Sequence, residues 1–194
     1  MYELIKKEGT ARAGKINLAH GSVETPGFMP VGTHGSVKGL TPSDLNEIGF
    51  KLILGNTYHL YLRPGTEIIL KFKGLHKFIG WSNNILTASG GFQDFSLCKL
   101  RKITEEGVFF KSHIDGSSHL ITPEKSIEIQ EALNSDIIMA FDECPKNPSS
   151  KEYSEQSLQL TLRWAKRCKN AKKEKSQKLF GIIQGGVFEE LRLE

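Results

Sequence analysis

The sequence lacks long apolar runs and paired cysteines. No stretch approaches the roughly 18 consecutive apolar residues that a membrane span needs, and the N-terminal MYELIKKEGTARAGK has no apolar core of a secretory signal. The cysteines number three (Cys98, Cys144 and Cys168) and show no CxxC spacing. These absences argue against a disulfide framework and a zinc site. We therefore expect a cytoplasmic protein with reduced thiols, no bound metal and no membrane partner.

The sequence also has little positive charge outside one segment. The formal net charge is +4, yet residues 163–178 hold eight basic side chains and a single acid, Glu174. The rest of the chain is therefore net negative. Either a solvated helical face or a contact with RNA explains such a segment, and the sequence leaves both open.

Short strands are predicted throughout. Residues 1–26 suggest antiparallel strands, with a turn at His20-Gly21-Ser22. Beyond them, apolar runs too short for amphipathic helices recur, as is typical of strands buried on both faces. These runs are FMPVG (28–32), LILGN (52–56), ILTAS (85–89), IIMAF (137–141) and LFGII (179–183).

Helix-start signals lie between most of these runs. Thr41-Pro42 and Thr122-Pro123 each place proline at a first helical position, and Ser149 with Glu152 forms a capping box before the basic segment. Asp115-Gly116 indicates a β-hairpin inserted at about 103–121. Alternating strands and helices indicate parallel βα units.

About five such units fit a doubly wound sheet or a (β/α)8 barrel. No G-x-G-x-x-G follows the first parallel strand, which argues against a dinucleotide-binding sheet. We therefore predict an α/β fold: residues 1–26 form a small antiparallel sheet, and residues 27–194 form an incomplete TIM-type (β/α)8 barrel.

Polar residues follow the predicted parallel strands at the end where barrel enzymes carry their chemistry. Taken singly, Asn56 and His59 are better explained as loop residues, and Asp142 is explained equally well as the cap of a loop. Together, their carboxylate, amide and hydroxyl groups suit a purine such as guanine, whose N1 and 2-amino groups donate and whose O6 accepts. Phe92 offers a stacking face. The set comprises Asn56, His59, Ser89, Gly90, Gly91, Phe92, Asp142, Cys144 and Gln184.

Longer motifs in the same order carry a resemblance that spans nearly the whole chain. The chain resembles the bacterial tRNA-guanine transglycosylases in FMPVGT, LGNTYHLYLRPG, SGGFQ, EEGVFFKSHIDGS, SIEIQEALNSDIIMAFDEC and FGIIQGG. The resemblance implies a modified TIM barrel and a double displacement at the wobble nucleotide of tRNA. An aspartate displaces guanine, and a 7-deazaguanine precursor of queuosine then attacks the covalent intermediate.

The resemblance also implies roles for individual residues. Asp142 reads the donor edge of the base, Ser89 and Gln184 contact it, and Phe92 stacks on it. Cys144 lines the pocket, and Gly90 and Gly91 keep their loop close to the ligand. Asn56 and His59 support that loop.

The chain departs from the family at the motif T-D-S-G-G, which here reads Thr87-Ala88-Ser89-Gly90-Gly91. The aspartate replaced by Ala88 is the family's general acid and base, and a methyl group cannot transfer a proton. The family's nucleophilic aspartate, zinc ligands and last barrel strands are expected beyond Glu194. We therefore expect a truncated pseudoenzyme, inactive and poorly stable alone.

Three interpretations remain open at this point. The chain is a transglycosylase by descent, paired with itself as a homodimer or with a complementing C-terminal fragment. Alternatively, it is a non-catalytic half-barrel partner or a tRNA-binding subunit. A third interpretation is an enzyme that acts on another purine or nucleoside through Asp142 and Gln184.

Overall fold

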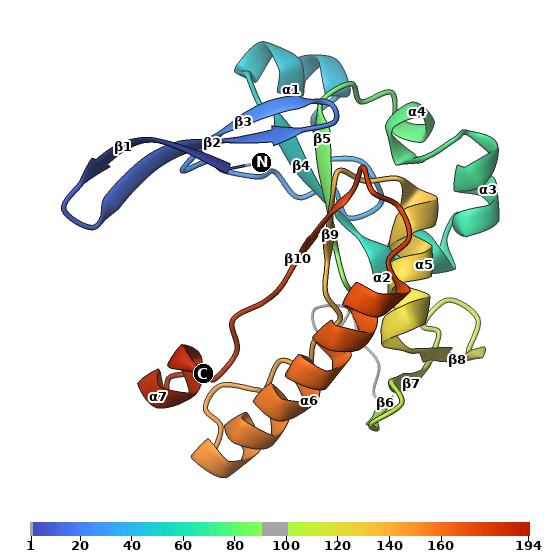
Figure 1. The fold of residues 1–194 in the computed structure, drawn as a ribbon. Helices are drawn as coiled ribbons and strands as arrows, with labels where there is room; N and C mark the ends of the chain where they lie inside the picture. The colour runs from blue at the N-terminus through green and yellow to red at the C-terminus, as the bar shows by residue number, and fades with distance from the viewer. Residues whose placement is uncertain (1, 91–100) are drawn as a thin grey trace.

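The computed structural model describes residues 2–90 and 101–194, which form a mixed α/β structure with three sheets (Figure 1). Gly91 and Phe92, two of the expected base-contacting residues, lie outside the described residues. Among the helices in the described ranges, none is long and apolar enough to cross a membrane. The expected division into two domains stays a prediction.

The N-terminal strands form an antiparallel sheet in the order β1-β2-β3, as expected. They are β1 (Tyr2–Glu8), β2 (Ala11–Leu18) and β3 (Gly21–Thr25). The sheet extends away from the centre of the molecule in Figure 1, and β1 is exposed along its length. Its inner end packs on the rest of the chain through Leu18 and the buried Val23, and His20 in the β2–β3 turn bonds to Asp136.

A parallel sheet occupies the centre of the molecule. Its strands are β4 (Leu52–Asn56), β5 (Asn84–Ala88), β9 (Ile137–Met139) and β10 (Lys178–Phe180), in the order β10-β9-β5-β4. This order follows the chain without the reversal of a doubly wound sheet. Four of the five expected strands are therefore present.

The remaining prediction, a strand at residues 28–32, is wrong. This segment makes only an isolated parallel bridge between Val31 and Leu54. Pro30 explains the difference, because its carbonyl accepts from the amide of Leu54 but its nitrogen has no hydrogen to extend a ladder.

Two of the expected helix starts are confirmed. Helix α1 (Pro42–Ile48) is capped by Thr41 in a reciprocal bond with Asp44, and α5 (Pro123–Leu133) is capped by Thr122. The start of α6 (Lys151–Ala171) was predicted one residue early. Ser150 caps this helix by accepting from the amide of Tyr153, so the capping box at Ser149 is wrong.

Several short elements were not predicted. Helices α2 (Thr57–Leu62), α3 (Thr66–Lys71) and α4 (Leu75–Ile79) connect β4 to β5, and α7 (Glu189–Leu193) lies near the end of the chain. The inserted hairpin is present with its turn at Asp115-Gly116, but it carries a third strand. The insertion consists of β6 (Arg101–Ile103), β7 (Val108–Lys111) and β8 (Ser118–Ile121).

Strands β4, β5 and β9 are buried on both faces, as their apolar runs indicated, whereas β10 is half-buried. Ile53, Ile85 and Ile138 belong to the larger core cluster, which includes helical residues such as Leu133 and Trp164. Their neighbours Leu52, Leu86 and Ile137 form a second cluster with Val23 of the N-terminal sheet. Successive side chains of a strand point to opposite faces, so each strand contributes to both clusters.

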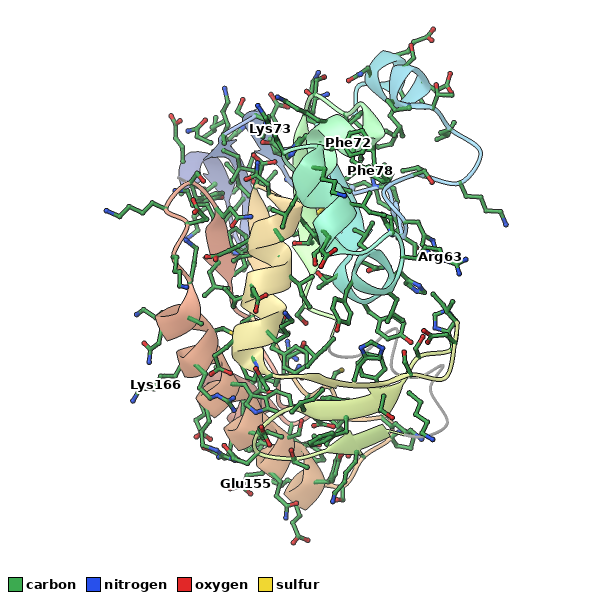
Figure 2. The ribbon with its side chains drawn as sticks, turned by 90° about the vertical axis from the view of Figure 1, so that its right-hand side faces the viewer. Arg63, Phe72, Lys73, Phe78, Glu155 and Lys166 are labelled. Atoms are coloured by element: carbon green, nitrogen blue, oxygen red, sulfur yellow. The ribbon has the colours of Figure 1, made fainter. Side chains whose placement is uncertain are left out.

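The arginines of the basic segment bind acidic residues of the same chain. Arg163 makes two 2.8 Å bonds to the carboxylate of Glu105, and Arg167 makes two 2.7 Å bonds to that of Glu124. These pairs attach α6 to the hairpin insertion and to the start of α5. Lys166 instead points away from α6 into solvent (Figure 2). The two arginines thus have an internal structural role, whereas Lys166 and Lys169 of the same helix are exposed.

The buried amide of Gln130 on α5 extends the sheet where its ladder stops. The pairing of β5 with β9 ends at Thr87 and Ile138, and the next residue, Met139, bonds to Gln130 instead. The Gln130 Oε1 accepts from the Met139 amide at 2.9 Å, and the Gln130 Nε2 donates to the Met139 carbonyl at 3.0 Å. Thr87 Oγ1 also donates to Oε1 at 3.0 Å.

We predict that Gln130→Leu lowers the free energy of unfolding by about 3–5 kcal/mol, because it leaves several buried polar groups unpaired. Urea denaturation measures the change. Glu128→Gln, an exposed change on the same helix, is the control and is expected to alter stability by less than about 0.5 kcal/mol. Equal effects of the two substitutions would contradict the role given to Gln130.

Candidate functional site

A cavity of about 460 Å³ opens at the carboxyl end of the parallel sheet. Apolar side chains from the strands and the neighbouring loops make its walls, and polar residues that follow the strands make its rim. The apolar residues are Met29, Leu54, Leu86, Met139, Ile182 and Ile183, and the rim residues are Asn56, Ala88, Ser89, Gly90, Asp142, Cys144 and Gln184.

The carboxylate of Asp142 is the centre of the polar rim. Ser89 Oγ donates to its Oδ1 at 3.1 Å, and Gln184 Nε2 donates to its Oδ2 at 2.8 Å. All three residues are buried, although 42 residues separate Gln184 from Asp142 and 53 separate Ser89 from it. The structure thus brings together three of the residues that the sequence singled out.

Two buried contacts from α5 hold the rim in place. Ser126 Oγ donates to the Ser89 carbonyl at 2.9 Å, and Gln130 Nε2 donates to Ser126 Oγ at 3.2 Å. Since Gln130 also holds Met139, one helix positions the residues that precede Asp142 and those that follow β5. Sequence reasoning missed both α5 residues. Their i, i+4 spacing within an apolar helix face was the available signal.

Burial changes the acidity of Asp142. Desolvation raises the pKa of Asp142 to about 6, and the nearby charge of Glu143 adds to the rise. The hydrogen bonds from Ser89 and Gln184 favour the charged form and partly offset this rise. The carboxyl group is therefore mostly ionised at neutral pH and can accept two hydrogen bonds from a planar ligand.

The neighbouring residues Glu143 and Cys144 have different surroundings. Glu143 turns towards α6, where its Oε1 accepts from the Tyr153 hydroxyl at 3.0 Å. Cys144 lines the cavity, and burial together with the charges of Asp142 and Glu143 raises the pKa of its thiol. A neutral thiol is a poor nucleophile, so Cys144 can serve as a wall of the cavity.

Three of the remaining expected site residues, Asn56, Ala88 and Gly90, line the cavity. Asn56 and Ala88 are paired in register at the ends of β4 and β5, and both line the cavity. Gly90 adopts a φ of +85°, and a Cβ there would lie 3.4 Å from the Tyr58 amide nitrogen. The chain after β5 thus packs closely on the start of α2.

His59 is placed differently from Asn56. It lies half-buried on α2, with its ring 4.8 Å from that of His34, and it is not among the described residues that line the cavity. Its expected support of the loop after β5 stays a prediction, as do the individual roles of the rim residues.

This arrangement can bind a polar planar ligand. Among the described lining residues, the carboxylate of Asp142 is the one ionised group, and no imidazole accompanies it. Ala88 presents a methyl group where the cavity meets the end of β5. The described rim therefore offers hydrogen bonds for recognition but no second carboxylate for proton transfer.

The raised pKa of Asp142 predicts a pH-dependent stability. Its folded pKa of about 6 exceeds the usual 3.8, so the free energy of unfolding falls as the pH rises from about 4 to about 6. We expect Asp142→Asn to remove this loss. The stability of the variant relative to the parent chain should increase by roughly 3 kcal/mol between pH 4 and pH 7.5. Urea denaturation at both pH values measures the difference, and a pH-independent difference would contradict it.

Comparison with known proteins gives one consistent result. Residues 7–194 match the family model described as queuine tRNA-ribosyltransferase. A queuine tRNA-ribosyltransferase of Thermoanaerobacter sp. (strain X514) is 60% identical over 196 residues, which cover 100% of this chain and 52% of that protein. Proteins of the same name from Fusobacterium nucleatum and Acinetobacter baylyi are each 58% identical and are covered over 52% and 51% of their lengths.

The chain thus spans about half the length of the curated relatives it matches. The match runs through the residues that follow β4, β5, β9 and β10, where the cavity lies. Residues from several of the motifs that carry the resemblance, among them Asn56, Ser89, Asp142 and Gln184, therefore lie around one cavity of the fold. The chain belongs to the queuine tRNA-ribosyltransferase family.

Proposed function

We propose that this chain supplies the base-reading side of a tRNA-guanine transglycosylase and lacks the proton-transfer group of that site. The observation that carries the proposal is the buried Ser89–Asp142–Gln184 group at the cavity rim. The family match supports the reaction class, which is the exchange of wobble guanine in tRNA for a 7-deazaguanine precursor of queuosine.

Hydrogen-bond geometry explains why this group suits guanine. The N1 hydrogen and the 2-amino group of guanine point in nearly the same direction, and a carboxylate can accept from both. Ser89 and Gln184 each donate to one oxygen of Asp142, which keeps the carboxylate fixed before the base arrives. The apolar walls Leu86 and Met139 provide surfaces against which the flat ring can pack.

The chemical step needs groups that this rim does not provide. In the double displacement, a carboxylate attacks C1′ of the ribose and a second group moves protons on the bases that leave and enter. Ala88 stands at the position of the family's acid and base. The family's nucleophilic aspartate would lie in sequence beyond Glu194.

The wider architecture follows from the same proposal. The sequential order of β4, β5, β9 and β10 supports an incomplete (β/α)8 barrel, whose remaining units would continue from β10. The target nucleotide would have to leave the base stack of tRNA to reach Asp142. The rest of the tRNA-binding surface would come from the half of the family's fold that this chain does not cover.

The first prediction from this proposed function concerns binding of free guanine. Guanine should bind this chain. Asp142→Asn should weaken binding about 10- to 150-fold, because the NH2 group that replaces one carboxylate oxygen is a donor and would face a donor of guanine. Isothermal titration calorimetry at pH 7.5 measures both affinities. Glu155→Gln removes an exposed carboxylate from α6 (Figure 2) and is expected to leave the affinity unchanged.

Equal loss in Asp142→Asn and Glu155→Gln would show that the rim does not read guanine. Binding of nucleosides without preference for guanine would instead favour an enzyme acting on another purine.

The second prediction concerns exchange of labelled guanine into tRNA. The chain, mixed with the C-terminal half of the Thermoanaerobacter relative, should give little exchange. Ala88→Asp in the same mixture should raise the rate about 10²- to 10⁴-fold, which is the usual contribution of a general acid and base. Appreciable exchange with Ala88 in place would refute the proposed loss of chemistry. Absence of exchange in both mixtures would favour a non-catalytic partner.

A further inference from the structure

A second group of polar side chains lies at the opposite edge of the parallel sheet from the cavity. Asp136 immediately precedes β9, and its backbone bonds to Ile85 and Lys178 at the amino ends of the neighbouring strands. His20 belongs to the turn between β2 and β3, and His76 lies on α4. Three elements that are distant in sequence therefore meet at one carboxylate.

Both oxygens of this carboxylate face an imidazole nitrogen. His20 Nδ1 lies 2.7 Å from Asp136 Oδ1, and His76 Nε2 lies 3.1 Å from Asp136 Oδ2. The two rings stack with their centroids 3.7 Å apart. One ligand atom from each of the three residues falls within 4.8 Å of the others, and theirs is the one such group in the described part of the chain.

We propose that His20, His76 and Asp136 bind a divalent transition-metal cation of the zinc class, which ties the N-terminal sheet to the edge of the parallel sheet. Two imidazoles and a carboxylate are a ligand set that zinc accepts, with water in the fourth position. The expectation of no metal site rested on the absence of CxxC spacing, whereas His76 and His20 lie 60 and 116 residues from Asp136 in the sequence.

The surroundings of the two rings fit this assignment. The side chain of His20 is 37% exposed, so a hydrated cation can reach the group from solvent. The ring of His76 is 9% exposed, and its Nδ1 is buried without a hydrogen-bond partner among the described residues. In the metal-free group Nε2 donates to the Asp136 carboxylate, so a cation bound at Nε2 would move the ring proton to Nδ1.

Binding requires the ligand atoms, which now lie within 4.8 Å of one another, to close around the ion, and the two stacked rings to turn towards it. A zinc ion lies about 2.0–2.1 Å from each nitrogen or oxygen ligand, so ligand atoms around a tetrahedral ion are about 3.3 Å apart. The present contacts of 2.7 and 3.1 Å would lengthen slightly as the cation replaces the protons between the rings and the carboxylate. The amides of Ile85 and His20 also donate to the Asp136 carboxylate and would orient it as a ligand.

The test uses the full chain, with Co²⁺ as a spectroscopic probe and Zn²⁺ in thermal unfolding. We expect one equivalent of Co²⁺ to give the visible absorption of a nitrogen- and oxygen-ligated tetrahedral ion. At about 100 times its dissociation constant, Zn²⁺ should raise Tm by about 5–10 °C. His20→Gln should abolish both effects, because glutamine retains an amide donor for Asp136 but no imidazole.

His119→Gln, which removes an imidazole from the hairpin insertion, is the matched control and should keep both effects. The metal-dependent change in Tm is compared within each variant, so a lower starting stability does not obscure the result. An unchanged Tm, an equal response in His20→Gln, or a thiolate-to-cobalt charge-transfer band from the cysteines would each overturn the proposal.

Discussion

The arrangement of the cavity depends on the hydrogen bonds of one side chain, the buried amide of Gln130. Its amide bonds to both backbone groups of Met139, where the β5–β9 ladder has ended, and accepts from Thr87 on the adjacent strand. Through Ser126 it also reaches the carbonyl of Ser89. A buried amide with every bond satisfied is rigid, because breaking any bond leaves an unpaired polar group. The positions of Ser89 and Asp142 are therefore set by α5 rather than by their own loops.

The sequence predicted the parts of the fold that local patterns specify. Alternating strands and helices predicted the parallel sheet, and Thr41-Pro42 and Thr122-Pro123 marked two helix starts correctly. The run at 28–32 looked like a strand because apolar content was visible, whereas the effect of Pro30 depends on its place beside β4. The capping box at Ser149 differed from the true cap by one residue, since two adjacent serines offer the same side chain.

The candidate site could be predicted only in part for a different reason. Ser89, Asp142 and Gln184 were found because each follows a parallel strand, and such positions meet at one edge of a sheet. The contacts among them are set by tertiary packing, as is the support from Ser126 and Gln130. His20, His76 and Asp136 gave no signal at all, because a ligand group assembled from three distant elements has no characteristic spacing.

The two edges of the parallel sheet are thus specialised. The carboxyl edge holds a fixed carboxylate over apolar walls, which is suited to recognising a base. Ala88 leaves that edge without a second carboxylate among its described rim residues. Recognition and proton transfer are separable in such a site, because hydrogen bonds to the bound base do not require a group that changes its protonation. The family relationship and the proposed loss of a catalytic group are therefore compatible in one chain.

Comparison of guanine with hypoxanthine tests the central claim most directly. Hypoxanthine keeps the N1 hydrogen and O6 of guanine but lacks the 2-amino group that the Asp142 carboxylate is proposed to accept. Calorimetric titration of the chain at pH 7.5 should show guanine binding about 10- to 100-fold more tightly, the value of one lost bond to a charged acceptor. Equal affinities for the two bases would contradict the claim that Asp142 reads the donor edge of guanine.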